Sequence, residues 1–212
     1  SPARLVLNPA MPLVRLGLFA CLTAGLGAQE NAAWSFRGEA QPDLQASGAV
    51  TFVQPGPRRP DYPTFDLKNQ AARFDGKGAR LMLADSPDHR FDFTNGDAIT
   101  LEAWVKLDGV DFRNVFTLVE DGKPANYITL LSTNLGEPRL LANGPNYGRS
   151  SPLSAGSGTF TSVANEWAHV AFRIDNSGNI SVIINGVVNT TTAKIDNSLT
   201  NTTNWTLRVG GS

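Results

Sequence analysis

Strict alternation of apolar and polar residues is the feature that most limits how this chain can fold. In Ala98–Leu107 every second residue from Ile99 onward is apolar, and most of the residues between are polar. Successive side chains of a strand point to opposite faces, so this pattern predicts a half-buried strand. Beyond residue 33 no long stretch has the three- and four-residue spacing of an amphipathic helix. The sequence therefore predicts an all-β chain.

A second alternating region predicts three consecutive strands. Ala168–Ile174 alternates, Asp175–Gly178 interrupts it, and Asn179–Ile184 resumes the pattern. The pair Asn185-Gly186 follows, and both residue types accept the positive φ angles of a type I′ hairpin turn. We expect a meander that turns here into Val187-Val188.

Further strands are expected at intervals, separated by clusters of Gly, Pro, Asn and Asp. Their spacing is typical of a sandwich or jelly roll, and they lie at Ala71–Asp75, Gly78–Leu83, Val115–Val119, Tyr127–Ser132, Arg139–Ala142 and Trp205–Val209. Asn143–Ser162 is a long polar loop rich in Gly and Ser. The proline-rich Asp43–Asp66 is expected to be an extended arm that crosses the surface.

Charge and length limit the classes of partner. The 18 basic residues nearly balance the 19 acidic ones, and they are scattered along the chain. Phosphate backbones are bound by concentrated basic surfaces, so we expect no nucleic-acid partner. A chain of 212 residues supports one sizeable core, and no linker divides it.

The N-terminal region has the pattern of a secretory signal. Arg15 precedes the apolar run Leu16–Ala28, which ends in small residues before Gln29. A membrane-spanning helix needs roughly 20 apolar residues, more than this run contains. The pattern predicts a signal peptide cleaved after Ala28, with a lipoprotein site at Cys21 as the alternative. We expect residues 1–28 to be removed and residues 29–212 to form one domain, secreted or periplasmic, with no membrane contact and no cysteine.

Three motifs, in order, resemble the laminin G-like or concanavalin A-like lectin jelly roll. Ala72–Gly76 resembles the opening strand of that family, Asp97–Lys106 its "TiEaWvk" strand, and Glu166–Gly186 its hairpin with a closing Asp/Asn-Gly turn. Leu207–Gly211 resembles a strand that comes late in the family domain. The narrower resemblance is to modules of large secreted bacterial proteins that also carry cytochrome regions.

The resemblance implies an antiparallel β-sandwich of jelly-roll type that lacks its last strand. In the family a final strand follows the position of Leu207–Gly211 and pairs with the N-terminal one. Ala33–Gly38 is the expected first strand, and we expect its edge to be unpaired. The chain also has Ile183 where the family hairpin carries an aromatic residue.

The residues predict no catalytic site. Glycosidases of this fold use two carboxylates about 5 to 10 Å apart, which i and i+2 positions on one strand supply. Glu102 and Glu166 each lack such a partner on their strands, so both are interpreted as solvated acids. His169 is interpreted as closing a hydrogen bond beside the core, and Trp104 either packs under a loop or lines a binding surface.

Calcium is the metal that the composition favours, because Asp and Asn are common and His and Cys are rare. The family resemblance implies calcium at the rim of the sandwich. The candidate ligands are acids in three loops, with solvated turn acids as the alternative: Asp85, Asp88, Asp108, Asp111, Glu120 and Asp121.

The expected function is recognition without catalysis, with a glycan or extracellular polysaccharide as ligand. Sugar sites combine an aromatic platform with amide and charged groups. The best such set is Tyr127, Asn143, Asn146, Tyr147 and Arg149. The alternative is a structural accessory domain that binds other domains of a larger secreted enzyme or cytochrome-type protein and no sugar.

Overall fold

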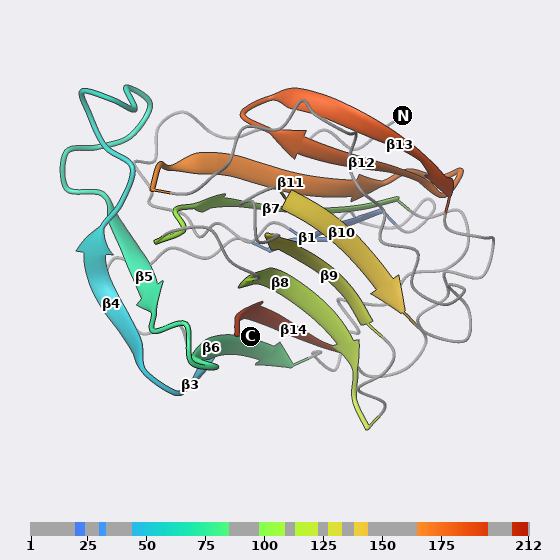
Figure 1. Cartoon of the computed structure of the whole chain (residues 1–212), viewed down its shortest axis with the longest axis horizontal. Helices are drawn as coiled ribbons and strands as arrows, with labels where there is room; N and C mark the ends of the chain where they lie inside the picture. Colours follow the sequence, from blue (N-terminus) through green and yellow to red (C-terminus); the bar gives the residue numbers. More distant parts are fainter. Residues whose placement is uncertain are drawn as a thin grey trace.

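The computed structural model describes residues 20–23, 30–32, 44–84, 98–108, 113–122, 127–132, 138–143, 165–194 and 205–211. All regular structure in these ranges is β-strand, arranged in two six-stranded sheets and one two-stranded sheet (Figure 1). The all-β prediction is confirmed. Within these ranges no helix is long and apolar enough to span a membrane.

The first sheet contains the strands with the clearest alternation. Its order is β13–β12–β11–β7–β1–β2, and every neighbouring pair is antiparallel. β7 is held by seven register pairs with β11, and the predicted meander is β11 to β13. The strands in sheet order are β13 (Val187–Lys194), β12 (Asn179–Ile184), β11 (Ala168–Ile174), β7 (Ala98–Val105), β1 (Ala20–Thr23) and β2 (Glu30–Ala32).

The second sheet is also antiparallel throughout, in the order β10–β9–β8–β14–β6–β3. Five of its strands match predicted ones, and β3 was not expected. The strands in sheet order are β10 (Pro138–Asn143), β9 (Tyr127–Ser132), β8 (Arg113–Glu120), β14 (Trp205–Gly210), β6 (Arg80–Ala84) and β3 (Gln45–Ser47).

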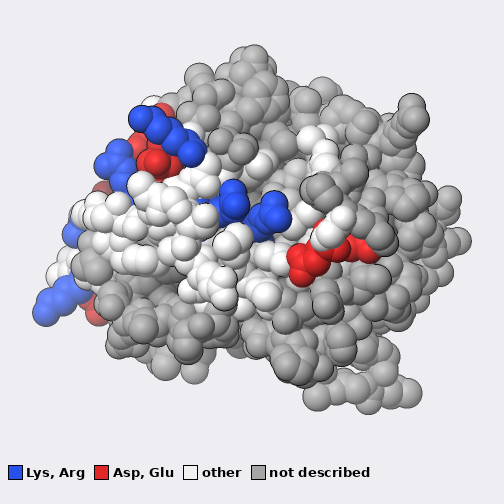
Figure 2. Space-filling view, turned by 90° about the horizontal axis from the view of Figure 1, so that it is seen from below, with Lys and Arg blue, Asp and Glu red and all other residues white. Residues whose placement is uncertain are grey.

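The core lies between the inner faces of these two sheets. Alternate residues of β7 and β14 are buried while their neighbours are half-buried. Phe116 of β8 and Phe172 of β11 meet across the interface, with ring centroids 5.6 Å apart. Removal of these apolar faces from water is the main force that joins the sheets. The outer faces carry the polar residues, and on the face shown in Figure 2 the described charges form small separate groups rather than a continuous basic stripe.

A small third sheet stands at one end of the sandwich (Figure 1) and consists of β4 (Val50–Pro55) and β5 (Gln70–Phe74). The loop 56–69 between them is closed by a hydrogen bond from the Gly56 amide to the Asn69 carbonyl at 3.1 Å. The arm predicted over Asp43–Asp66 is therefore wrong in part, because it contains β3 and β4. These strands pair with β6 and β5, later in the chain, and local patterns do not reveal such pairings.

The hairpin turn between β12 and β13 forms as predicted. Asn185 and Gly186 have φ angles of 49° and 83°, the two positive values that a type I′ turn needs. The Asn185 side chain also accepts a hydrogen bond from the His169 amide at 2.9 Å. The turn is thus tied back to the neighbouring strand β11.

The N-terminal strands fall in and beside the run predicted as a signal peptide. β1 lies next to β7 through three pairs, from Cys21↔Thr100 to Thr23↔Ala98, and β2 pairs with β1. The cleavage after Ala28 stays a prediction. The expected first strand Ala33–Gly38, and with it the expected unpaired edge, lies outside the described residues.

Candidate functional site

Two of the five predicted ligand residues lie side by side. Asn143 of β10 and Tyr127 of β9 are direct register partners, and Tyr127 is half-buried. Asn146, Tyr147 and Arg149 lie outside the described residues. The structure therefore brings together the part of the predicted surface that is carried on strands.

Three of the six acids considered as calcium ligands are described, and each contacts another group or is buried. Asp108 forms an ion pair with Arg73 at 3.0 Å, Asp121 accepts a hydrogen bond from the Thr206 hydroxyl at 2.7 Å, and Glu120 is buried. Asp85, Asp88 and Asp111 lie outside the described ranges. In the part of the chain that is described, no three His, Cys, Asp or Glu residues are grouped to hold a metal ion.

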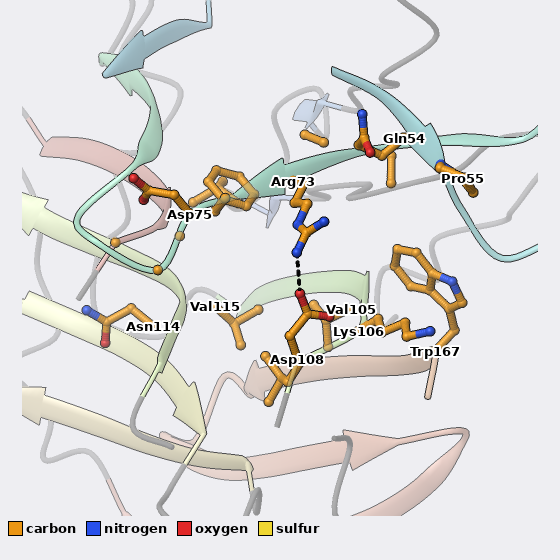
Figure 3. A pocket seen from close by; sticks show the side chains of 18 residues that line it. Gln54, Pro55, Arg73, Asp75, Val105, Lys106, Asp108, Asn114, Val115 and Trp167 are labelled. Atoms are coloured by element: carbon orange, nitrogen blue, oxygen red, sulfur yellow. Dashed lines mark hydrogen bonds and ion pairs between the residues drawn. The ribbon is translucent and has the colours of Figure 1, made fainter. Parts of the chain in front are cut away.

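A cavity lies where the small third sheet meets the end of the sandwich. Its volume is about 720 Å³, within the range of small-molecule sites. Residues from β4, β5, the end of β7, the start of β8 and the end of β14 line it, together with Trp167 just before β11. Figure 3 shows Trp167 on one side, Asn114 on the other, and the Arg73–Asp108 pair between them. We call this cavity the rim pocket.

The charges of the rim pocket balance. Arg73 and Lys106 supply positive charge, and Asp75 and Asp108 supply negative charge. Both side chains of the Arg73–Asp108 pair are mostly exposed, at 66% and 69%. An ion pair this exposed adds little to stability, since water screens it. Its donors and acceptors therefore remain accessible to a ligand.

Asp75 has a structural task in the pocket wall. Its Oδ1 accepts hydrogen bonds from the amides of Lys77 at 2.8 Å and Ala79 at 3.4 Å. This holds the turn between β5 and β6, which also contains positive φ angles at Gly76 and Gly78. Asp75 is nevertheless exposed, so both its carboxylate and that of Asp108 border the pocket.

The end of β14 enters the pocket wall as two glycines. Gly210 has a φ of 75°, and a Cβ there would lie 2.7 Å from the Phe74 ring. Only glycine fits such an approach without displacing the ring. The Asn114 amide donates to the Gly211 carbonyl at 3.3 Å, which joins β8 to this end of the chain. At this point of the pocket wall the Phe74 ring therefore packs directly on the Gly210 backbone.

Trp167 is the aromatic group of the rim pocket. It is half-buried, and its carbonyl accepts a hydrogen bond from the Tyr62 hydroxyl at 3.2 Å. Tyr62 belongs to the loop 56–69, so this loop and β11 hold Trp167 together. An indole at the side of a polar cavity can stack on the apolar face of a sugar ring.

Trp104 packs under the loop 56–69, which confirms the first of its two predicted roles. Its ring lies edge to face with Tyr62 at 5.6 Å and Phe65 at 5.2 Å, and 5.6 Å from the His169 ring. Aromatic pairs in this geometry stabilise beyond simple burial. Trp104 is therefore covered and is not a binding platform.

The interpretation of Glu102 as a solvated acid is wrong. Its side chain is 13% exposed and lies 3.3 Å from the His169 Nε2. The two residues stand on neighbouring strands, with His169 in register with Trp104 and Ala171 in register with Glu102. The partner comes from β11, 67 positions away, so the β7 sequence alone could not reveal it. A carboxylate thus lies beside the His169 ring, where a hydrogen-bonding partner was expected.

The sequence motifs pointed to the strands of the rim pocket but not to the pocket itself. Arg73 stands at an exposed position of β5 and Lys106 directly follows β7, both strands that were correctly predicted, and Trp167 lies at the start of the predicted hairpin. Nothing in the local pattern distinguishes them from ordinary surface residues. A useful signal was their position at strand ends, where loops of a sandwich gather.

Comparison with known proteins places the chain in a family. A family model described as the concanavalin A-like lectin/glucanases superfamily matches residues 75–212, more than half of the chain. The chain belongs to this superfamily, as its motifs predicted. No curated protein matches it.

Two solved structures are similar at low identity. One is the receptor binding domain of botulinum neurotoxin mosaic serotype C/D, with 9% identity and a TM-score of 0.49 over 92% of this chain and 46% of that chain. The chain thus spans less than half of that structure. The other is a carbohydrate esterase from the Shiga toxin-encoding bacteriophage phi24B, with 15% identity and a TM-score of 0.30 over 78% of this chain and 81% of that chain.

Proposed function

We propose that this chain is a secreted, non-catalytic recognition module that binds a carbohydrate in the rim pocket. The observation that carries the proposal is the pocket's combination of Trp167 with balanced donors and acceptors from Arg73, Lys106 and Asp108. A sugar presents an apolar ring face, which can stack on an indole, and many neutral hydroxyl groups, which can hydrogen-bond to charged side chains whose net charge is zero. Membership in a superfamily of lectins and glucanases supports the same class of ligand.

The contacts of three described acids support binding rather than hydrolysis. A glycosidase needs one acid that holds a proton and a second that is free to act as base or nucleophile. Glu102 contacts His169, Asp108 contacts Arg73, and Asp75 holds a turn. In the rim pocket, Asp108 would therefore orient sugar hydroxyls together with Arg73.

The proposal predicts that pocket variants lose binding and keep the fold. Trp167→Ala and Arg73→Gln should each weaken the binding of a glycan found on a polysaccharide array, by roughly tenfold or more. Calorimetric titration gives the affinity, and thermal melting checks the fold. Arg73→Gln should melt within a few degrees of wild type because the ion pair is exposed.

Tyr127→Ala is the matched control, because it alters the other candidate surface. Retained binding in this variant supports the rim pocket. Lost binding in Tyr127→Ala with retained binding in Trp167→Ala would transfer the site to Tyr127 and Asn143. Wild-type protein that binds no glycan on the array would favour the structural accessory role. Repeating the titration with EDTA and then with added calcium tests the predicted calcium dependence.

A further inference from the structure

Two arginines lie on the outer face of the second sheet, close to the rim pocket. Arg80 begins β6 and Arg208 lies within β14. In both strands the neighbours of the arginine are buried, so both arginine side chains point away from the core, and both are half-buried. They are therefore held against the sheet and do not extend freely into water.

The strand register makes the two arginines diagonal neighbours. Gly210 is paired with Arg80, and Arg208 with Met82. Diagonal neighbours of an antiparallel pair are about 7–8 Å apart, within reach of long side chains. Two like charges at this separation repel each other unless an anion lies between them. Figure 2 shows basic groups next to one another in the middle of this side of the molecule, with an acidic group beside them.

The surroundings of the arginines do not supply the missing negative charge. Among the described residues neither arginine forms an ion pair, and the Nε of each is shielded from solvent without a hydrogen-bond partner. Thr117 is the register partner of Arg208 on β8, and its hydroxyl is hydrogen-bonded to the Thr129 hydroxyl at 2.7 Å. Asp121 borders this face, where it accepts a hydrogen bond from the Thr206 hydroxyl at 2.7 Å, two positions before Arg208. Among the described residues no ion pair joins it to either arginine, so the two positive charges are not neutralised by a direct contact.

The two arginines lie next to the edge of the rim pocket that Gly210 and Gly211 form. Gly210 and Gly211 line the pocket, and Gly210 is paired with Arg80. A Cβ on Gly211 would lie 3.8 Å from the Cβ of Arg80. The Phe74 ring lies against Gly210, so a ligand that leaves the pocket over Gly211 would reach Arg80 first and then Arg208.

We propose that Arg80 and Arg208 form a subsite for an acidic group, so that the glycan recognised by this protein is an acidic polysaccharide. The inference rests on the proposed function, because it extends the ligand of the rim pocket. A guanidinium offers a planar fork of N–H donors that fits the oxygens of a carboxylate or a sulfate ester. Bound between the arginines, such a group removes their repulsion. The rim pocket then contacts the neutral hydroxyls of the glycan, and the two arginines give the protein its preference for glycans with acidic groups.

The test measures the binding of the full chain to alginate, which carries carboxylates, to dextran sulfate, and to neutral dextran. The double variant Arg80→Gln/Arg208→Gln should bind at least one acidic polymer roughly tenfold or more weakly than wild type does. Arg58→Gln is the matched control: it also removes a positive charge, from an exposed position in the loop 56–69. It should bind like wild type. The lysine double variant, which keeps charge but loses the fork, should bind with intermediate affinity.

The outcomes separate the subsite from the pocket. Loss of acidic-polymer binding in the arginine variant alone supports the subsite. An equal loss in Arg58→Gln would mean that the total positive charge of the protein, and not the two arginines, determines binding, and it would overturn the subsite. Loss in Trp167→Ala with no loss in the arginine variant leaves the pocket and removes the subsite. Loss in the arginine variant with full binding in Trp167→Ala removes the pocket instead. The inference is also overturned if the wild-type protein binds neither acidic polymer. It is supported if inorganic sulfate raises the melting temperature of the wild type but not that of the arginine variant.

Discussion

Single residues define the turns of this protein, and Asp175 is the clearest case. Its Oδ1 accepts hydrogen bonds from the amides of Ser177 at 2.8 Å and Asn179 at 2.9 Å, and its Oδ2 accepts one from the Asn179 side chain at 2.9 Å. Burial is the largest single effect and raises the pKa of Asp175. The hydrogen bonds and the nearby Arg173 charge together outweigh it, and they lower the pKa below its usual 3.8.

This lowered pKa predicts a pH-dependent contribution of Asp175 to stability. Because the folded pKa is below the unfolded value, the stabilisation is fully present above pH 3.8 and is lost as the pH falls through the folded pKa. Asp175→Asn keeps an acceptor in the turn but cannot titrate. Wild type should therefore melt higher than this variant at pH 6, and the gap should close as the pH falls below 3.8. A gap that stays constant from pH 6 to pH 2.5 would contradict the assignment.

At the scale of elements, the loop 56–69 is the part that joins the small third sheet to the sandwich. Phe65 and Tyr62 place their edges on the Trp104 ring, and the Tyr62 hydroxyl donates to the carbonyl of Trp167. Asn69 is buried, and its side-chain amide donates to the Pro57 carbonyl inside the loop. The loop thus connects the packing of Trp104 to the position of Trp167 in the rim pocket.

Two loop variants should separate these contributions. Phe65→Ala removes a buried ring and should destabilise the protein by about 3 kcal/mol if the loop and the core unfold together. Tyr62→Phe keeps the ring on Trp104 and removes one hydrogen bond, which should cost about 1 kcal/mol. Urea denaturation measures both. If Phe65→Ala costs no more than Tyr62→Phe, the loop is not packed on the sheet as described.

At the scale of the whole molecule, residues 20–23 have two competing assignments. They form β1 against β7, and they also lie inside the run predicted as a signal peptide. β7 is bound by seven register pairs to β11 and by three to β1. Most of the pairing that holds β7 therefore survives the loss of β1.

We expect the protein secreted from its own precursor to begin at Gln29 and still to unfold cooperatively. N-terminal sequencing gives the first residue, and thermal melting gives the cooperativity. Hydrogen exchange should be faster at residues 98–100 than in a chain that keeps β1, because these residues lose their pairing with β1. Secreted protein that retains residues 1–28 would contradict the signal-peptide prediction.

Local patterns were enough to predict the strands and turns that depend on nearby residues. Alternation located β7 and β11, and the Asn185-Gly186 pair predicted the turn into β13 correctly. These features follow from backbone geometry and side-chain direction within a few residues. β3 and β4 were missed because β3 has only three residues and β4 runs into a proline-rich segment that does not have the pattern of a strand.

The amino-acid sequence by itself determined the all-β class, the main strands and the superfamily of this protein. Only the tertiary structure decided which outward residues meet. Arg73 and Asp108 are 35 positions apart, and Glu102 and His169 are 67 apart, yet each pair is in contact. The physical reason is that strand order across a sheet is set by burying the apolar faces together, while the polar faces are carried along. The rim pocket and the two arginines are products of that order.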